Sequence, residues 1–144
     1  MPTSLSQREI EHILQLYRLF KQGDPTFLDL YEPDATLVFP DSLPNGGTYS
    51  SPLEALEFWN SVGELFEGAR PEPEEFIRDG ERLVVLGHFH GRAKATGKKV
   101  AIRFAHVFAV ADAEAPLTEQ RFVYFELIID TAVALSAVPE PETG

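Results

Sequence analysis

The chain has 144 residues, of which 44% are hydrophobic, carries a formal net charge of −11 and contains no cysteine. We expect residues 1–144 to form a single domain with its own core, an ordered part at about 7–137 and a flexible tail at 139–144. Because the chain has no cysteine, disulfides, thiolate metal ligands and a cysteine nucleophile are excluded. The acidic balance disfavours nucleic acid as a partner, because binding it requires cationic side chains that displace counterions. No signal region or membrane-spanning run is evident, so we expect a cytoplasmic protein without a membrane partner.

Apolar spacing and capping motifs predict three helices in the first half of the chain. Ser51-Pro52-Leu53-Glu54 is a capping box with proline at the first helical position. Asp24-Pro25 is a second start of this kind, with the aspartate as N-cap. The predicted helices cover residues 6–22, 24–31 and 51–66, and a terminal helical turn is expected at 131–138.

Alternating apolar residues predict strands, most of them in the second half of the chain. The predicted strands cover residues 35–39, 74–78, 82–94, 98–110 and 117–130, with a loop at 41–50. The last four strands are consecutive, which is typical of an antiparallel sheet. Helices segregated to one face of such a sheet give an α+β domain.

The strand at 98–110 has one bulky apolar face with a titratable residue in its middle. The side chains on this face belong to Val100, Ile102, Phe104, His106, Phe108 and Val110. If Thr96 and Gly97 are the two turn residues, His106 is paired with Gly87 on the preceding strand. A glycine there would leave room for a ligand beside His106, although it would equally suit a bend or bulge of the sheet. We therefore interpret His106 as a pocket residue, with a satisfied core histidine as the alternative.

The last strand ends in an acid, Asp130, that could share this pocket. As a pocket residue, Asp130 would have a carboxyl pKa raised by apolar walls and would act as an acid/base with His106 as its partner. As a capping residue, Asp130 would instead be the N-cap of the terminal helical turn, because Asp-Thr precedes Ala-Val-Ala-Leu. Glu126 has the same strand parity and is a second candidate acid. The remaining pocket lining is predicted to consist of Tyr17, Phe39, Trp59, Asn60, Val85, Gly87, Phe89, Phe104 and Phe108.

The opposite face of the same two strands carries His88 and His90 beside small and apolar residues. The two histidines could be metal ligands, but neither strand places an acid on this face, and we expect no metal and no cofactor. Histidines at the surface or in a dimer interface are the favoured interpretation. Because Leu86, Ala105 and Val107 would suit a flat sheet-to-sheet contact, the sequence predicts a homodimer built on this face.

Several short motifs resemble the nuclear transport factor 2-like superfamily, and within it the SnoaL-like proteins, a group that includes polyketide cyclases. They are Gly23-Asp24, Tyr31-Glu-Pro-Asp34-Ala-Thr-Leu, Gly-Gly-Thr-Tyr49, and Ala-Thr-Gly-Lys before Phe-Ala-His-Val-Phe. The resemblance covers roughly residues 7 to 137. It implies a curved antiparallel sheet wrapped into a cone, a cystatin-like arrangement closed by helices around a deep apolar pocket.

The resemblance also implies three activities that can be compared position by position. The base of ketosteroid isomerases falls at Phe39 and their second acid at His106, which excludes an isomerase of that type. Limonene-type epoxide hydrolases would share only Asp130. The histidine–aspartate pair of SnoaL-like cyclases matches His106 and Asp130 best. The resemblance thus implies a small-molecule-binding domain, as a cyclase- or isomerase-like enzyme on an apolar carbonyl compound or as a non-catalytic ligand-binding or dimerisation module.

Overall fold

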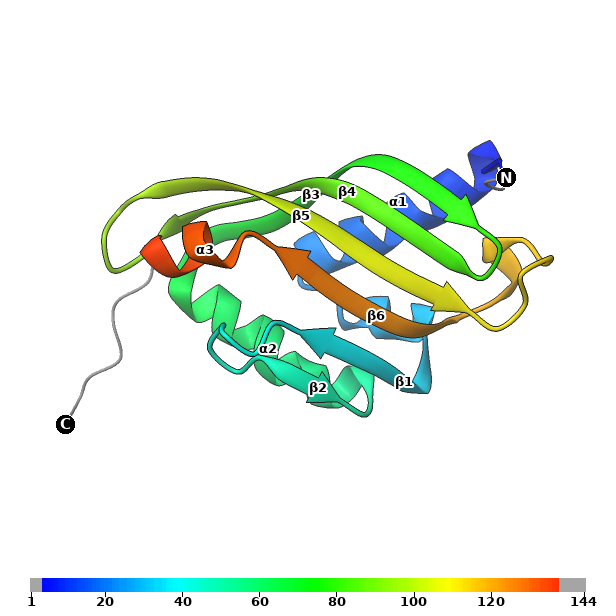
Figure 1. Cartoon of the computed structure of the whole chain (residues 1–144), viewed down its shortest axis with the longest axis horizontal. Helices are drawn as coiled ribbons and strands as arrows, with labels where there is room; N and C mark the ends of the chain where they lie inside the picture. Colours follow the sequence, from blue (N-terminus) through cyan, green and yellow to red (C-terminus); the bar gives the residue numbers. More distant parts are fainter. Residues whose placement is uncertain (1–3, 138–144) are drawn as a thin grey trace.

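The computed structural model describes residues 4–137, which form one curved sheet of six strands with helices packed on it (Figure 1). The strands are β1 (Tyr31–Phe39), β2 (Gly47–Tyr49), β3 (Phe66–Asp79), β4 (Arg82–Ala93), β5 (Lys99–Val110) and β6 (Phe122–Ile129). Their order is β2-β1-β6-β5-β4-β3, and neighbours are antiparallel except for the parallel pair β1 and β6. The predicted α+β class with a mostly antiparallel sheet is confirmed.

The helices are α1 (Gln7–Lys21), the 3-10 helix η1 (Pro25–Leu30), α2 (Pro52–Leu65), the 3-10 helix η2 (Leu117–Glu119) and α3 (Thr131–Ala137). Of these, η1 and α2 begin at the predicted capping motifs Asp24-Pro25 and Ser51-Pro52, whereas η2 lies in a segment that was predicted to be strand. The hydroxyls of Ser6 and Ser51 each accept a backbone N–H bond of 3.1 Å in the first turn of α1 and α2. α1 packs against β3, and α2 packs against β1 and β3. Figure 1 shows both helices on the same side of the sheet, so the side chains between helices and sheet form the core.

The register of β4 and β5 differs from the prediction by two residues. His106 is paired with Val85, and Gly87 is paired with Phe104. The cause is a longer connection than predicted, because Ala93 N–H donates to the carbonyl of Lys98 at 2.8 Å and four residues lie between them. A shift of two preserves strand parity, so His106 still faces the inside of the curved sheet.

Other strands also differ from the prediction, since β1 begins at Tyr31 rather than at residue 35 and β6 begins at Phe122 rather than at residue 117. β3 begins at Phe66 rather than at residue 74 and contains Pro71 and Pro73. These prolines are tolerated because β3 is an edge strand, where one row of N–H groups has no partner strand. The short strand β2 lies in the segment that was predicted to be loop. The expected flexible tail, residues 139–144, lies outside the described residues.

A buried ion pair, not predicted from the sequence, joins α1 to the end of β3. Arg78 Nη1 donates to Glu9 Oε2 at 3.0 Å, and the Arg78 side chain is only 3% exposed. Burial raises the pKa of the Glu9 carboxyl, but backbone N–H bonds from Leu117 and Ser6 and the charge of Arg78 outweigh it, so the pKa is lowered overall. The Nη2 group of Arg78 donates to the carbonyls of Asp112, Ala113 and Ala115. The pair thereby fixes the loop between β5 and η2 against α1.

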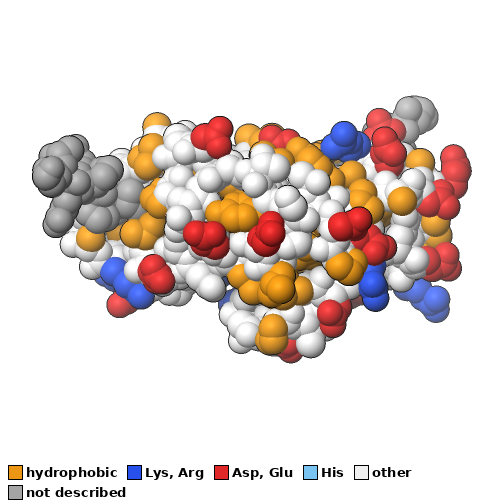
Figure 2. All heavy atoms as spheres, turned by 90° about the horizontal axis from the view of Figure 1, so that it is seen from below, with side chains coloured by type: hydrophobic (Ala, Val, Ile, Leu, Met, Phe, Trp, Pro, Cys, Tyr) orange, Lys and Arg blue, Asp and Glu red, His pale blue; other side chains and the backbone are white. Residues whose placement is uncertain are grey.

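The surface reflects the acidic composition. On the face shown in Figure 2, Asp and Glu side chains outnumber Lys and Arg and are interspersed with apolar side chains. Among residues 4–137, no helix combines the length and the apolar character needed to cross a bilayer.

Candidate functional site

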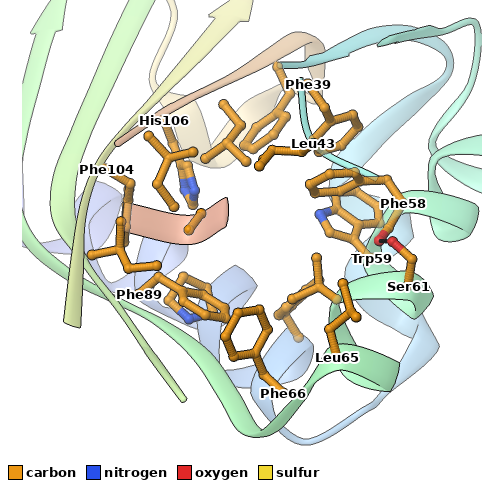
Figure 3. A pocket seen from close by; sticks show the side chains of 18 of the residues that line it. Phe39, Leu43, Phe58, Trp59, Ser61, Leu65, Phe66, Phe89, Phe104 and His106 are labelled. Carbon is orange, nitrogen blue, oxygen red and sulfur yellow. Dashed lines mark hydrogen bonds between the residues drawn. The ribbon is translucent and has the colours of Figure 1, made fainter. Parts of the chain in front are cut away.

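A cavity of about 120 Å³ lies between the curved sheet and the helices (Figure 3). This is roughly ten times the space that a single water molecule needs. The walls come from the inner face of the sheet, from α1, α2 and α3, and from the loop after β1. Most of its lining is aromatic or aliphatic and includes Leu43, Phe58, Leu65, Phe66, Ile102, Phe125, Leu127 and Leu135.

His106 lies in the middle of β5 and is the one histidine among the described residues that line the cavity. Its ring stacks on Phe104 at a centroid distance of 4.0 Å and lies 5.0 Å from the ring of Phe125. It is 8% exposed, and burial lowers its pKa to about 3. The imidazole is therefore neutral at physiological pH.

The partner of His106 is Tyr17 on α1. The Tyr17 hydroxyl lies 2.6 Å from His106 Nδ1. Burial and the nearby Tyr31 raise the pKa of Tyr17 well above its ordinary value, so the phenol keeps its proton. Within residues 4–137, Nδ1 is the hydrogen-bond partner of this hydroxyl. Because a buried hydroxyl hydrogen without an acceptor is costly, we assign Tyr17 as donor to Nδ1, which leaves the imidazole proton on Nε2.

The Nε2 atom of His106 faces the cavity. It has no hydrogen-bond partner within residues 4–137. Among residues 4–137, the only side-chain nitrogen or oxygen that is both fully enclosed by protein and without a hydrogen-bond partner is His12 Nε2, so His106 Nε2 is not enclosed in this way. Figure 3 shows the nitrogens of His106 directed into the cavity. The tautomer assigned above makes it a hydrogen-bond donor for whatever occupies the cavity.

The structure brings most of the predicted pocket residues together. The predicted residues that line the cavity are Tyr17, Phe39, Trp59, Phe89, Phe104, His106 and Phe108. Their common signal was strand or helix periodicity, which survives an error of two residues in register.

Three predicted lining residues do not reach the cavity. Val85 is fully buried beside His106 in the sheet but does not line the cavity. Gly87 leaves no space for a ligand, because a Cβ there would collide with the backbone oxygen of Glu72 and lie 2.8 Å from the ring of Phe104. Asn60 is exposed on α2. Because a helix rotates by about 100° per residue, Asn60 does not face the cavity that its neighbour Trp59 lines.

Asp130 does not share the cavity with His106. It is exposed, and its carboxylate accepts the backbone N–H of Val133 at 3.2 Å, as the N-cap of α3. A register irregularity between Phe122 and Tyr124 reverses the parity of β6, so that the later even-numbered residues face away from the cavity. Glu126 is one of these and accepts a hydrogen bond from the Tyr124 hydroxyl at 2.9 Å.

The polar groups of the lining are few. Among the described residues that line the cavity there is no Asp, Glu, Lys or Arg. The Ser61 hydroxyl is already bound to the Phe58 carbonyl at 2.6 Å. Tyr31 Oη and Trp59 Nε1 have no partner within residues 4–137 and are not fully enclosed, so they are available to a ligand. The site can thus hold an apolar molecule with oxygen acceptors, and it offers no carboxylate for proton transfer.

The histidines on the outer face of the sheet lie beside acids from β3, which sequence reasoning did not place there. His88 Nδ1 lies 2.8 Å from Glu74, and His90 Nε2 lies 3.5 Å from Glu72. Across residues 4–137, no group of three His, Asp or Glu side chains is arranged to hold a metal ion.

Comparisons with known proteins agree with this architecture. Residues 13–115 match the model of a family described as SnoaL-like domain. An NTF2-like protein of unknown function from Burkholderia pseudomallei has a TM-score of 0.79 and 28% identity, covering 94% of this chain and 100% of that chain. TerC, co-crystallised with polyporic acid, has a TM-score of 0.75 and 28% identity over 90% of this chain and 96% of that chain. IdmH from Streptomyces antibioticus, a candidate polyketide cyclase, has a TM-score of 0.71 and 19% identity, covering 91% of this chain and 98% of that chain. No curated protein matches the chain.

Proposed function

Because the chain belongs to the SnoaL-like family, we propose that it binds a small, largely apolar carbonyl compound in the cavity beside His106. One observation carries this proposal: a neutral histidine, held at Nδ1 by Tyr17, presents Nε2–H to a cavity whose lining is mostly apolar. The ligand carbonyl accepts the hydrogen bond, and the aromatic walls enclose its ring system.

The walls supply most of the affinity and His106 supplies the orientation. Burial of apolar surface contributes about 25 cal/mol per Å², and flat rings gain further from offset or edge contacts with aromatic walls. A hydrogen bond in such low-dielectric surroundings is stronger than in water and favours one orientation of the ligand. TerC, which is 28% identical over most of the chain, was co-crystallised with a small organic molecule, which supports a ligand of this class.

An acid/base reaction of the aspartate-dependent type receives less support than binding. Such a reaction needs a group that takes up a proton near neutral pH, within reach of the substrate. No described residue lining the cavity is a carboxylate, and burial lowers the pKa of His106 to about 3. We therefore favour ligand binding over catalysis as the function of this site.

The proposal can be tested with two bicyclic compounds, α-tetralone, which has one carbonyl, and naphthalene, which has none. Quenching of Trp59, the single tryptophan of the chain, reports binding of each. In ¹⁵N-histidine-labelled protein, the His106 signals, assigned with His106→Phe, should show the Nε2-protonated tautomer. The Nε2 signal should shift with α-tetralone and much less with naphthalene, because only the ketone accepts a hydrogen bond.

The other three histidines are internal controls, because none of them lines the cavity. Their signals should not move with either compound. An Nδ1-protonated His106, equal shifts with both compounds, or no binding of α-tetralone would contradict the proposal.

A further inference from the structure

The opening of the cavity is framed by α3 and by the loop of residues 41–46. β1 and β6 are parallel neighbours, so the segments that follow them, this loop and α3, leave the sheet at the same end (Figure 1). Of the described residues that line the cavity, Pro44 in the loop and Leu135 on α3 are the exposed ones. Because a lining residue that also meets solvent marks where a cavity reaches the surface, the opening lies between these two segments.

The loop is the fixed side of this opening. The Leu43 N–H group donates to the Pro40 carbonyl at 3.1 Å, and the Gly46 N–H group donates to the Leu43 carbonyl at 2.9 Å. The Tyr49 hydroxyl donates to the Asn45 carbonyl at 2.5 Å. A Cβ atom on Gly46 would lie 1.9 Å from the Pro40 carbonyl oxygen, so the turn is closely packed. These contacts hold the loop in one conformation.

The helix α3 is the side that can move. It has seven residues, and a helix this short is marginal without tertiary support. Its buried side chains are those of Ala134 and Ala137, which bury little apolar area. Asp130 holds its first turn, since the carboxylate accepts the Val133 N–H group at 3.2 Å and the carbonyl accepts the Ala134 N–H group at 3.1 Å. Few buried contacts give α3 a low free energy of local opening.

We propose that α3 is a lid on the cavity, which lets molecules in and out when it leaves its place on β5, and that the Asp130 cap sets how often it opens. The inference goes beyond the proposed function, because it holds for any molecule that enters the cavity. Leu135 lines the cavity and is 39% exposed, so the closed lid covers the opening with this side chain. Asp130 does not line the cavity, so its cap stabilises the closed lid equally whether the cavity is empty or filled.

This equality gives the lid a kinetic signature. Loss of the cap raises the open fraction of the empty and the filled protein by the same factor, so entry and exit accelerate together and the dissociation constant stays the same. A residue that contacts the bound molecule would change the dissociation constant instead. A residue with a purely structural role, away from the route of entry, would change neither rate.

The test uses benzene, which needs no hydrogen bond from His106. An apolar cavity of about 150 Å³ binds benzene, and the cavity here, at about 120 Å³, is of similar size. Trp59 lines the cavity and is the single tryptophan, so the line shape of its indole N–H signal during a titration gives both rate constants. Asp130→Ala should raise both about fivefold, the usual effect of a lost N-cap, whereas Asp130→Asn, which keeps an acceptor, should leave them unchanged.

A variant with the opposite effect completes the comparison. The first turn of α3 contains no acidic residue, and Thr131 does not line the cavity. Thr131→Glu should stabilise the closed lid through the helix dipole and slow both rates about twofold. Unchanged rates in Asp130→Ala, or a faster exit without a faster entry, would overturn the inference.

A measurement on the unmodified protein does not depend on the folding of any variant. The Ala134 amide should exchange its hydrogen far faster than the amides of β5, a strand with partners on both sides. Equal protection of these amides, or a failure of benzene to reach the cavity, would mean that α3 does not open. If the His106 signal fails to respond to α-tetralone while benzene enters as described, the proposed function fails and the lid stands.

Discussion

Burial of His106 should make the protein less stable in mild acid. The folded pKa of His106 is lowered from 6.5 to about 3, so a proton binds the unfolded chain more tightly than the folded one. Stability is therefore greatest above the unfolded value and is lost as the pH falls from there towards the folded value. From pH 7.5 to pH 5.5, linkage gives a loss of about 1.4 kcal/mol from this one residue.

The assay is urea unfolding at these two pH values, followed by the fluorescence of Trp59. Both values lie above the sequence pI of about 4.7, where solubility is poorest. His106→Phe removes the titrating group and leaves the Tyr17 hydroxyl without its partner, a cost of similar size at both pH values. The wild type should therefore lose about 1.4 kcal/mol more than the variant between pH 7.5 and pH 5.5.

Equal losses in the two proteins would refute the reasoning. They would mean that folded His106 takes up a proton as easily as unfolded His106 does. The neutral Nε2–H donor on which the proposed function depends would then be lost as well.

Three further predictions concern stability and assembly. Arg78→Met should lower the free energy of unfolding in urea by about 3–5 kcal/mol, because Glu9 is left buried without its partner, and Glu9→Gln combined with Arg78→Met should cost less. Asp130→Ala should remove the cap of α3 and cost about 1 kcal/mol, whereas Asp130→Asn should cost little, and a change in α-tetralone affinity with Asp130→Asn would contradict a purely capping role. Light scattering at micromolar concentration should give the mass of a dimer built on the outer sheet face, and Val107→Glu on that face should give a monomer.

The sequence by itself determined the class of fold, the start of each main helix and the side of the sheet on which His106 lies. Capping depends on residues three positions apart, and strand parity depends on alternate residues, so both are local. For this reason His106 faces inward even though its cross-strand partner is Val85 rather than Gly87. The aromatic lining from β5 and Trp59 followed from the same periodicities.

Only the tertiary structure decided what surrounds His106. Its contact with Tyr17 joins residues 89 positions apart, and nothing local specifies such a pair. Asp130 illustrates the limit of parity, because the irregularity after Phe122 turns the end of β6 outward and leaves the acid as a helix cap. A bulge costs little locally and is set by how the strand must bend to close around the core, so its position is decided by packing rather than by the pattern of the strand itself.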